Sequence, residues 1–196
     1  LLVVSQSTRH QFAFANSSDN ECAGDAMVLS KADVLIPVRD GEKYIATAIA
    51  SLAADVEFIN KLIIVDDGSS DGTASFLSNL DWKGKTEIIH QPPLGLCAAL
   101  NRGLNAAEAP LVARMDADDI SIPGRLKAQI EYLESEPSVT AVGAQVLTID
   151  AEGRVTGDRS NHPLDAKAIR DQLYKKGSCA ISHPTVMMRK DAVLAC

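Results

Sequence analysis

Between Ala32 and Leu133 the sequence alternates short apolar runs with longer amphipathic segments. The apolar runs have the length of buried strands, and they lie at residues 34–38, 62–65, 86–89 and 111–115. The segments between them carry apolar residues at helical spacing, such as Ile45, Ile49 and Leu52. Strands that alternate with helices in this way form right-handed βαβ units. We therefore predict an α/β protein with a mainly parallel central sheet flanked by helices.

This alternation ends after Leu133, and a mixed half follows. The expected elements there are a strand over 139–149, a turn over 150–153, a hairpin partner near Val155, a helix over 165–176 and a strand over 181–188. Residues 1–31 are rich in Ser, Asn, Gln and Asp without a sustained period, which is typical of a tail or peripheral segment. We therefore expect one domain over 32–196, divided into halves at 32–120 and 121–196.

Charge and cysteine content exclude several classes of protein. The 196 residues hold 19 Lys and Arg against 26 Asp and Glu, a net charge of −7 without a basic cluster, which argues against nucleic-acid binding. Cys22, Cys97, Cys179 and Cys196 form no C-x-x-C pair, a pattern that favours a reducing compartment and gives no zinc signature. No segment approaches the roughly 20 apolar residues of a membrane span. We expect a cytoplasmic protein, with peripheral contact at the inner face of the cell membrane left open.

Three carboxylates, Asp116, Asp118 and Asp119, follow the apolar run at 111–115. Carboxylates at the carboxyl end of a strand lie where α/β sheets bind ligands. Such a cluster repels itself unless a proton or cation neutralises it, and Mg²⁺ and Mn²⁺ prefer carboxylate oxygen. In D-x-D the first and last side chains can face the same side of an extended backbone and share one ion. A polar loop with helix-capping Asp is the alternative for the tripeptide alone.

A second acidic loop, Asp66 to Gly72, follows the apolar run at 62–65. Asp67 would point into the same crevice as the first cluster and could accept hydrogen bonds from a base or ribose. The alternative is a β-turn in which Asp71 caps the next helix. The sequence lacks both G-x-x-x-x-G-K-[ST] and G-x-G-x-x-G, which argues against a phosphate loop and a dinucleotide dehydrogenase.

Six segments, in order, resemble family 2 glycosyltransferases, especially bacterial enzymes that build surface polysaccharides. They are V-L-I-P-V-R at 34–39, I-I-V-D-D-G-S-S-D-G-T at 63–73, G-L-C-A-A-L-N-R-G-L at 95–104, A-R-M-D-A-D-D-I-S-I-P-G-R-L at 113–126, V-G-A-Q-V-L-T-I-D-A-E-G-R-V at 142–155 and H-P-T-V-M-M-R at 183–189. Each motif is weak alone, and the ordered set covers about Ala32 to Cys196.

The resemblance implies a GT-A-type nucleotide-diphospho-sugar transferase fold, with a nucleotide-binding half at 32–120 and the start of an acceptor half at 121–196. It implies inverting, metal-dependent transfer of a sugar from a nucleotide diphosphate-sugar to a glycan or lipid-linked acceptor. Carried over residue by residue, Pro37, Val38 and Arg39 line the base pocket, Asp67 contacts the base, Asp116 approaches the ribose or metal, Asp118 ligates Mn²⁺ or Mg²⁺, and Asp119 and His183 line the site. On this assignment Asp67→Ala should weaken nucleotide binding and leave thermal unfolding nearly unchanged.

Some features depart from the family pattern. Asp40 stands where Asn is common in the family, so its negative charge suits a nearby diphosphate only if the side chain points away. Pro93 and Leu94 stand where the family often has Asn followed by a polar or basic residue. The family's general base usually lies in an acidic pair beyond the H-P-T-V-M-x-R strand, so we expect it after Cys196 and expect this chain to be C-terminally truncated. Two rivals remain, a nucleotidyltransferase-like enzyme and a nucleotide-sugar binding module without turnover.

Overall fold

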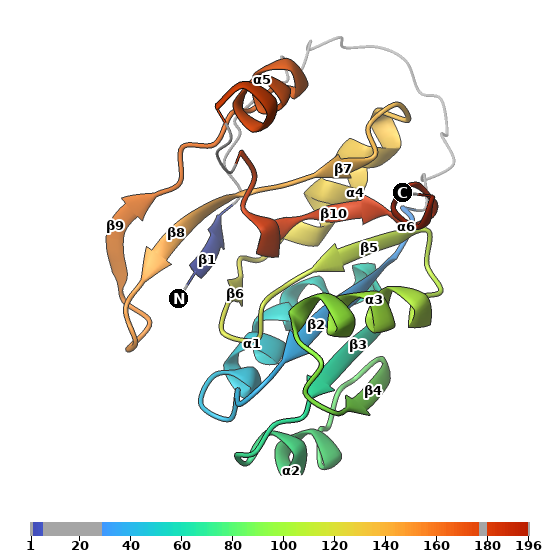
Figure 1. Ribbon diagram of the computed structural model, residues 1–196, viewed down its shortest axis with the longest axis vertical. Coiled ribbons are helices and arrows are strands. Elements are labelled where there is room, and N and C mark those ends of the chain that lie inside the picture. Colours follow the sequence, from blue (N-terminus) through green and yellow to red (C-terminus); the bar gives the residue numbers. More distant parts are fainter. Residues whose placement is uncertain (1, 6–28, 177–179, 196) are drawn as a thin grey trace, which may run out of the picture.

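The computed structural model describes residues 2–5, 29–176 and 180–195. Its larger sheet has six strands in the order β4-β3-β2-β5-β10-β7 (Figure 1). These strands are β4 (Lys85–Gln91), β3 (Ile59–Asp67), β2 (Ala32–Val38), β5 (Leu111–Arg114), β10 (Met187–Arg189) and β7 (Ala141–Val142). The first four run parallel, whereas β10 is antiparallel to both β5 and β7. The predicted mainly parallel sheet with a mixed second half is therefore confirmed.

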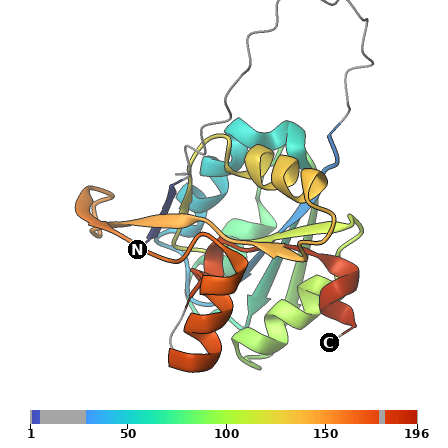
Figure 2. The same ribbon diagram turned by 90° about the horizontal axis from the view of Figure 1, so that it is seen from above.

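Helices cover both faces of this sheet, which is why its central strands are apolar throughout. The helical elements are α1 (Ile45–Ser51), η1 (Leu52–Phe58), α2 (Thr73–Ser78), α3 (Leu96–Ala106), α4 (Arg125–Ser135), α5 (Ala166–Lys176), η2 (His183–Thr185) and α6 (Lys190–Leu194). Ile36 of β2 packs in one core cluster with residues of α1, α2 and α4, while its neighbour Leu35 packs with α3 on the opposite face. Figure 2 shows α1 and α4 on one side of the sheet and α3 on the other. None of the described helices is long and apolar enough to cross a membrane.

A smaller sheet lies beside the carboxyl edge of the larger one (Figure 1). Its order is β6-β1-β8-β9, with β6 at Ile120–Ser121, β1 at Leu2–Ser5, β8 at Gln145–Ile149 and β9 at Val155–Arg159. β1 pairs parallel with β6 and antiparallel with β8. Of the expected N-terminal tail, residues 2–5 thus form a strand, and residues 6–28 lie outside the described part.

Two predicted strands differ in the structure. The run over 139–149 is divided between the two sheets, because β7 ends at Val142 and β8 begins at Gln145. Gly143 lies at this break, where an added Cβ would collide with the side chain of Ile181. The segment expected as a strand over 181–188 begins instead with the single 3-10 turn η2, and only Met187–Arg189 pair as β10.

A buried lysine links strands at the amino edge of the large sheet. Lys61 is 1% exposed, and its Nζ donates to Glu87 Oε2 at 2.7 Å, to Glu108 Oε1 at 2.9 Å and to the carbonyl of Ala106 at 2.6 Å. Lys85 also donates to Glu108. The hydrogen bond from Lys85, followed by that from Lys61, lowers the pKa of Glu108 to about 2. This network lies at the end of the sheet opposite the predicted site.

Candidate active site

The carboxyl edge of the large sheet gathers the residues that the sequence singled out. The predicted site residues there are Pro37, Val38, Arg39, Asp67, Asp116, Asp118 and Asp119. Because β3, β2 and β5 are neighbours, the segments that follow these strands lie side by side. His183 joins them from η2, since the charges of both Arg114 and Asp116 act on its pKa. The structure therefore brings all of these residues to one region.

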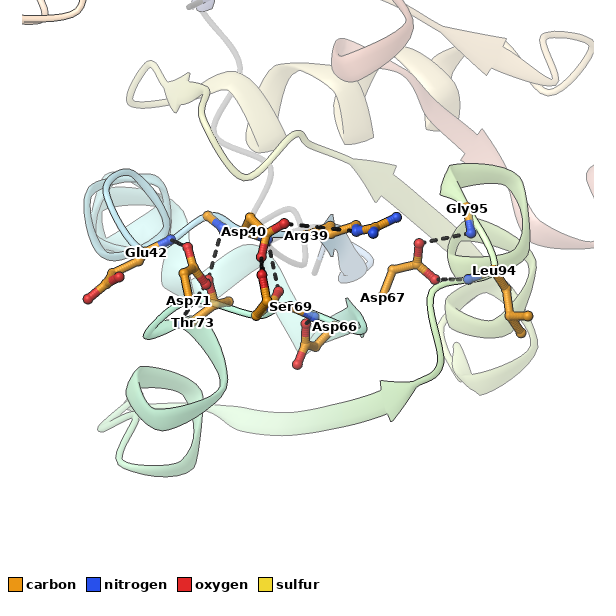
Figure 3. Close-up of polar contacts among 12 residues, drawn as sticks. Arg39, Asp40, Glu42, Asp66, Asp67, Ser69, Asp71, Thr73, Leu94 and Gly95 are labelled. Atoms are coloured by element: carbon orange, nitrogen blue, oxygen red, sulfur yellow. Dashed lines mark hydrogen bonds and ion pairs between the residues drawn. The ribbon is translucent and has the colours of Figure 1, made fainter.

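The loop after β2 is tied to the loop after β3 (Figure 3). Asp40 Oδ1 accepts hydrogen bonds from the Ser70 N–H at 2.7 Å and the Ser70 hydroxyl at 3.1 Å, and the Asp40 N–H donates to Ser69 Oγ at 2.9 Å. Asp40 has a left-handed backbone, with φ at 51°. The Asp40 carboxylate is thus directed into the neighbouring loop. A negative charge at this position is compatible with a nearby diphosphate only if the side chain points elsewhere, and the bonds to Ser70 hold it in the other loop.

Further hydrogen bonds join the same two loops at Glu42, Asp71 and Gly72. The Glu42 N–H donates to Asp71 Oδ2 at 3.0 Å, and the Gly72 N–H donates to Glu42 Oε2 at 3.0 Å. Asp71 Oδ1 also accepts the N–H of Thr73, the first residue of α2, at 3.0 Å. Asp71 therefore has a structural role in the turn, as expected, but the N-cap of α2 is Gly72 and not Asp71. We call Asp40, Glu42, Ser69, Ser70, Asp71, Gly72 and Thr73 the loop clamp, with the Gly41 N–H also donating to Thr73 Oγ1.

Asp67 is 4% exposed and already holds three protein donors. Its Oδ1 accepts from Gln91 Nε2 at 2.7 Å and from the Leu94 N–H at 2.8 Å, and its Oδ2 accepts from the Gly95 N–H at 2.8 Å. The bond from Gln91, reinforced by these two amides, lowers the pKa of Asp67. The carboxylate thus fixes the loop that leads into α3 (Figure 3). The expectation that its removal would leave folding stability unchanged conflicts with this burial.

Arg39 extends from the end of β2 between two carboxylates. Its Nε lies 3.9 Å from Asp40 Oδ2, and its charge contributes to the lowered pKa of Asp67. The side chain is 55% exposed, and Figure 3 shows it directed toward Asp67. A half-exposed planar cation at this edge can stack on a base or pair with phosphate.

Asp116 is paired with Arg114, the last residue of β5. Arg114 Nη2 donates to Asp116 Oδ1. Burial nevertheless raises the pKa of Asp116 above its ordinary value; the Arg114 charge opposes this rise, and the nearby Asp118 carboxylate adds to it. A carboxyl in this setting is favoured in its charged form by any further cation that binds beside it.

The remaining residues differ in exposure. Asp118 is exposed, and Asp119 is 2% exposed. Desolvation lowers the pKa of His183; the Arg114 charge adds to this effect, and Asp116 opposes it. Exposed and partly buried carboxylates such as Asp118 and Asp116 suit a hard divalent cation.

A pocket of about 170 Å³ opens beside Asp118. It is lined by Lys43, Tyr44, Thr47 and Ala48 at the start of α1, by Asp118, Asp119 and Ile120, and by residues 151–153 of the turn between β8 and β9. Across residues 2–5, 29–176 and 180–195, no three His, Cys, Asp or Glu side chains are grouped so that they could hold a metal ion by themselves. An ion at Asp116 and Asp118 would therefore take its other ligands from water or from its substrate.

Sequence reasoning missed two features of this region. Arg114 interrupts a buried apolar run, and a charged residue in such a run requires a partner, so its spacing from Asp116 was a usable signal. The loop clamp had no such signal, because its hydrogen bonds join residues about 30 positions apart.

Comparisons with known proteins agree with this geometry. The family model described as Glycosyl transferase family 2 matches residues 33–194. The amylovoran biosynthesis glycosyltransferase AmsE of Erwinia amylovora is 32% identical over 167 residues, a match that covers 83% of this chain and 61% of AmsE. The chain therefore spans less than two thirds of the length of this relative.

Two solved structures share the fold. S. aureus TarS, residues 1–349, superimposes with a TM-score of 0.62 at 21% identity, covering 84% of this chain and 48% of TarS, and TarS has also been solved in complex with UDP-GlcNAc. The mannosyltransferase PcManGT from Pyrobaculum calidifontis, solved with GDP-Man and Mn²⁺, matches with a TM-score of 0.51 at 20% identity over 64% of this chain and 38% of PcManGT. The fold is thus the GT-A type expected from the sequence, and the chain belongs to glycosyl transferase family 2.

Proposed function

We propose that this chain is the donor-binding part of an enzyme that transfers a sugar from a nucleotide diphosphate-sugar to a glycan or lipid-linked acceptor in cell-surface polysaccharide synthesis. The observation that carries the proposal is the meeting of Arg39, Asp67, Asp116 and Asp118 at the carboxyl edge of three adjacent strands. Family membership, the polysaccharide role in the name of AmsE, and the nucleotide-sugars bound by TarS and PcManGT support it.

The nucleoside lies across the ends of β2 and β3 in this proposal. Pro37, Val38 and Arg39 line one side of the base, and Asp67 lies on the other. Since Asp67 gives three acceptor positions to the protein, it has room for one more donor from the base. The loop clamp keeps both loops in place before the nucleotide arrives, which reduces the entropy that binding must overcome.

Asp118 and Asp116 would hold a divalent cation, Mn²⁺ or Mg²⁺, that the diphosphate of the donor brings with it. The fit rests on the donor set, because Asp118 is exposed and the Asp116 side chain, 32% exposed, gives only its Oδ1 to Arg114. Burial also raises the pKa of Asp116, and a nearby cation would favour its charged form. Such an ion supplies Lewis-acid stabilisation for the leaving nucleoside diphosphate. Asp119 and His183 line the site without a ligand role.

Transfer with inversion requires a carboxylate base on the face opposite the leaving group. We assign this role to no residue of this chain, and we expect it in the acidic pair that the family places after the H-P-T-V-M-x-R strand.

The proposal is tested by comparing nucleoside diphosphates with triphosphates. Calorimetric titration with UDP, GDP, UTP and GTP in MnCl₂ should show tighter binding of one diphosphate than of its triphosphate, and a matching sugar nucleotide should compete with it. A nucleotidyltransferase-like enzyme would instead favour the triphosphate. Failure to bind any of these nucleotides contradicts the proposal.

A further inference from the structure

Arg114 is a buried cation at the last position of a central strand. Its side chain is 4% exposed. Its backbone is held on both sides, because its N–H donates to the carbonyl of Val186 at 2.8 Å and its Cα lies opposite Leu35 of β2. A guanidinium at such a position loses most of its hydration, so it is retained only where a specific partner compensates. Its partner is the carboxylate of Asp116.

The other nitrogen atoms of the Arg114 guanidinium lack hydrogen-bond acceptors in the described part of the chain. Arg114 Nε and Nη1 are buried and have no hydrogen-bond partner among the described residues. A buried ion pair with unpaired donors is a weak contribution to folding stability, and an apolar side chain of similar volume would suit this strand as well. Stability therefore does not explain an arginine here, whereas the position of Asp116 does.

Asp116 depends on Arg114 for its orientation. Oδ1 of Asp116 accepts from Arg114, and within the described residues no side chain or amide donates to Oδ2. Asp116 is 32% exposed, so this second oxygen belongs to a carboxylate that a ligand can approach. Because Arg114 is fixed by the strand and by burial, it restricts the rotation of a carboxylate that lies in a loop.

We propose that Arg114 is a positioning residue for nucleotide binding, which holds the Asp116 carboxylate with its second oxygen turned toward the ribose or metal of the donor. This inference rests on the proposed function. The charge of Arg114 also lies beside the Asp116 carboxylate, where it reduces the repulsion of an incoming diphosphate by that carboxylate. Lys at this position would keep the charge and lose the planar geometry that fixes a carboxylate.

The test measures UDP and GDP binding in MnCl₂ by calorimetry, with each variant shown to be folded by circular dichroism. Arg114→Met should raise the Kd of the nucleotide that binds by about tenfold or more, and Arg114→Lys should recover part of that loss. Lys61→Met is the matched control: Lys61 is a buried cation that donates to Glu87, Glu108 and the carbonyl of Ala106 at the opposite end of the sheet. It should lower the unfolding midpoint and leave the Kd unchanged.

A double-mutant cycle separates positioning from a general structural effect. In the Asp116→Asn background, Arg114→Met should add little to the Kd, because the carboxylate that Arg114 positions is already absent. Equal Kd values for the unaltered chain and Arg114→Met, or additive effects of the two substitutions, overturn the inference. If Arg114→Met does not fold, the same double-mutant cycle is measured with Arg114→Lys and Asp116→Asn. An unaltered chain that binds neither nucleotide overturns the proposed function, and the inference with it.

Discussion

Oδ1 of Asp40 accepts hydrogen bonds from both the N–H and the hydroxyl of Ser70, at 2.7 and 3.1 Å. The two residues lie in different loops, one after β2 and one after β3, and both loops border the proposed nucleotide site. A left-handed φ of 51° at Asp40 accompanies this contact, a conformation that Asp and Asn adopt more readily than Ala. The contact therefore combines a local backbone requirement with a long-range bond.

Asp40→Ala should lower the free energy of unfolding by about 1 kcal/mol, because the bonds to Ser70 are lost and Ala disfavours a positive φ. The expected loss of unfolding free energy is small for a charged acceptor, because the Asp40 carboxylate is exposed to solvent. Asp40→Asn keeps an acceptor and the backbone preference, and should remain close to the unaltered chain in urea unfolding. Asp40→Gly should fall between them. Equal loss in Asp40→Asn and Asp40→Ala would contradict this account of the clamp.

Asp67→Ala should reduce both folding stability and nucleotide affinity. Removal of this buried carboxylate leaves Gln91 Nε2 and the amides of Leu94 and Gly95 without their acceptor, at a cost of about 3 kcal/mol. Gln91→Leu is the matched control, since it removes one of the three donors and keeps both amide bonds, so its loss should be smaller. Urea unfolding and calorimetry on the same samples measure both effects. An unaltered unfolding midpoint for Asp67→Ala would restore the interpretation based on sequence alone.

The parallel strands and their order of appearance follow from apolar runs such as those ending in Val38 and Val65, so the fold and the edge that holds the site were predictable. The family motifs also placed Asp116, Asp118 and His183 in one region. The division of residues 139–149 between two sheets was not predictable, because strand pairing joins residues distant in the sequence, such as β1 with β8 and β10 with β7. Contacts between distant loops, such as those of Asp40 and Glu42, leave no local pattern in the sequence.

The network at the amino edge of the large sheet predicts an acid-sensitive contribution to stability. Because hydrogen bonds from Lys85 and Lys61 hold the pKa of Glu108 at about 2 in the folded protein, against 4.5 as its ordinary value, its ionised form favours folding. This contribution is present in full above pH 4.5 and is lost as pH falls toward about 2. Glu108→Gln should therefore be less stable than the unaltered chain at pH 7, and the difference should shrink at pH 3. A difference that is independent of pH would contradict this assignment.

Gly103 of α3 packs directly on Leu35 of β2, so close that an added Cβ would collide with the leucine methyl groups. Gly103→Ala should destabilise the fold by about 1–3 kcal/mol, despite the higher helix propensity of Ala. Asn101→Ala, at an exposed position of the same helix, should be neutral or stabilising. Thermal unfolding of the two variants compares the steric cost of the added methyl group with the gain in helix propensity. A Gly103→Ala variant more stable than the unaltered chain would contradict this prediction and show that α3 moves away from the sheet at little cost.

The proposed donor site requires a cation at Asp118, and metal-dependent nucleotide binding tests this requirement most directly. Calorimetric titration of UDP and GDP should give a Kd about tenfold or more lower in MnCl₂ than in chelator for the unaltered chain. Asp118→Asn should abolish that difference, because an uncharged amide is a poorer ligand for a hard cation. Glu152→Gln, which removes another exposed carboxylate from the same pocket, should preserve it. Equal affinity of the unaltered chain with and without metal, or a metal effect that survives in Asp118→Asn, would contradict the account.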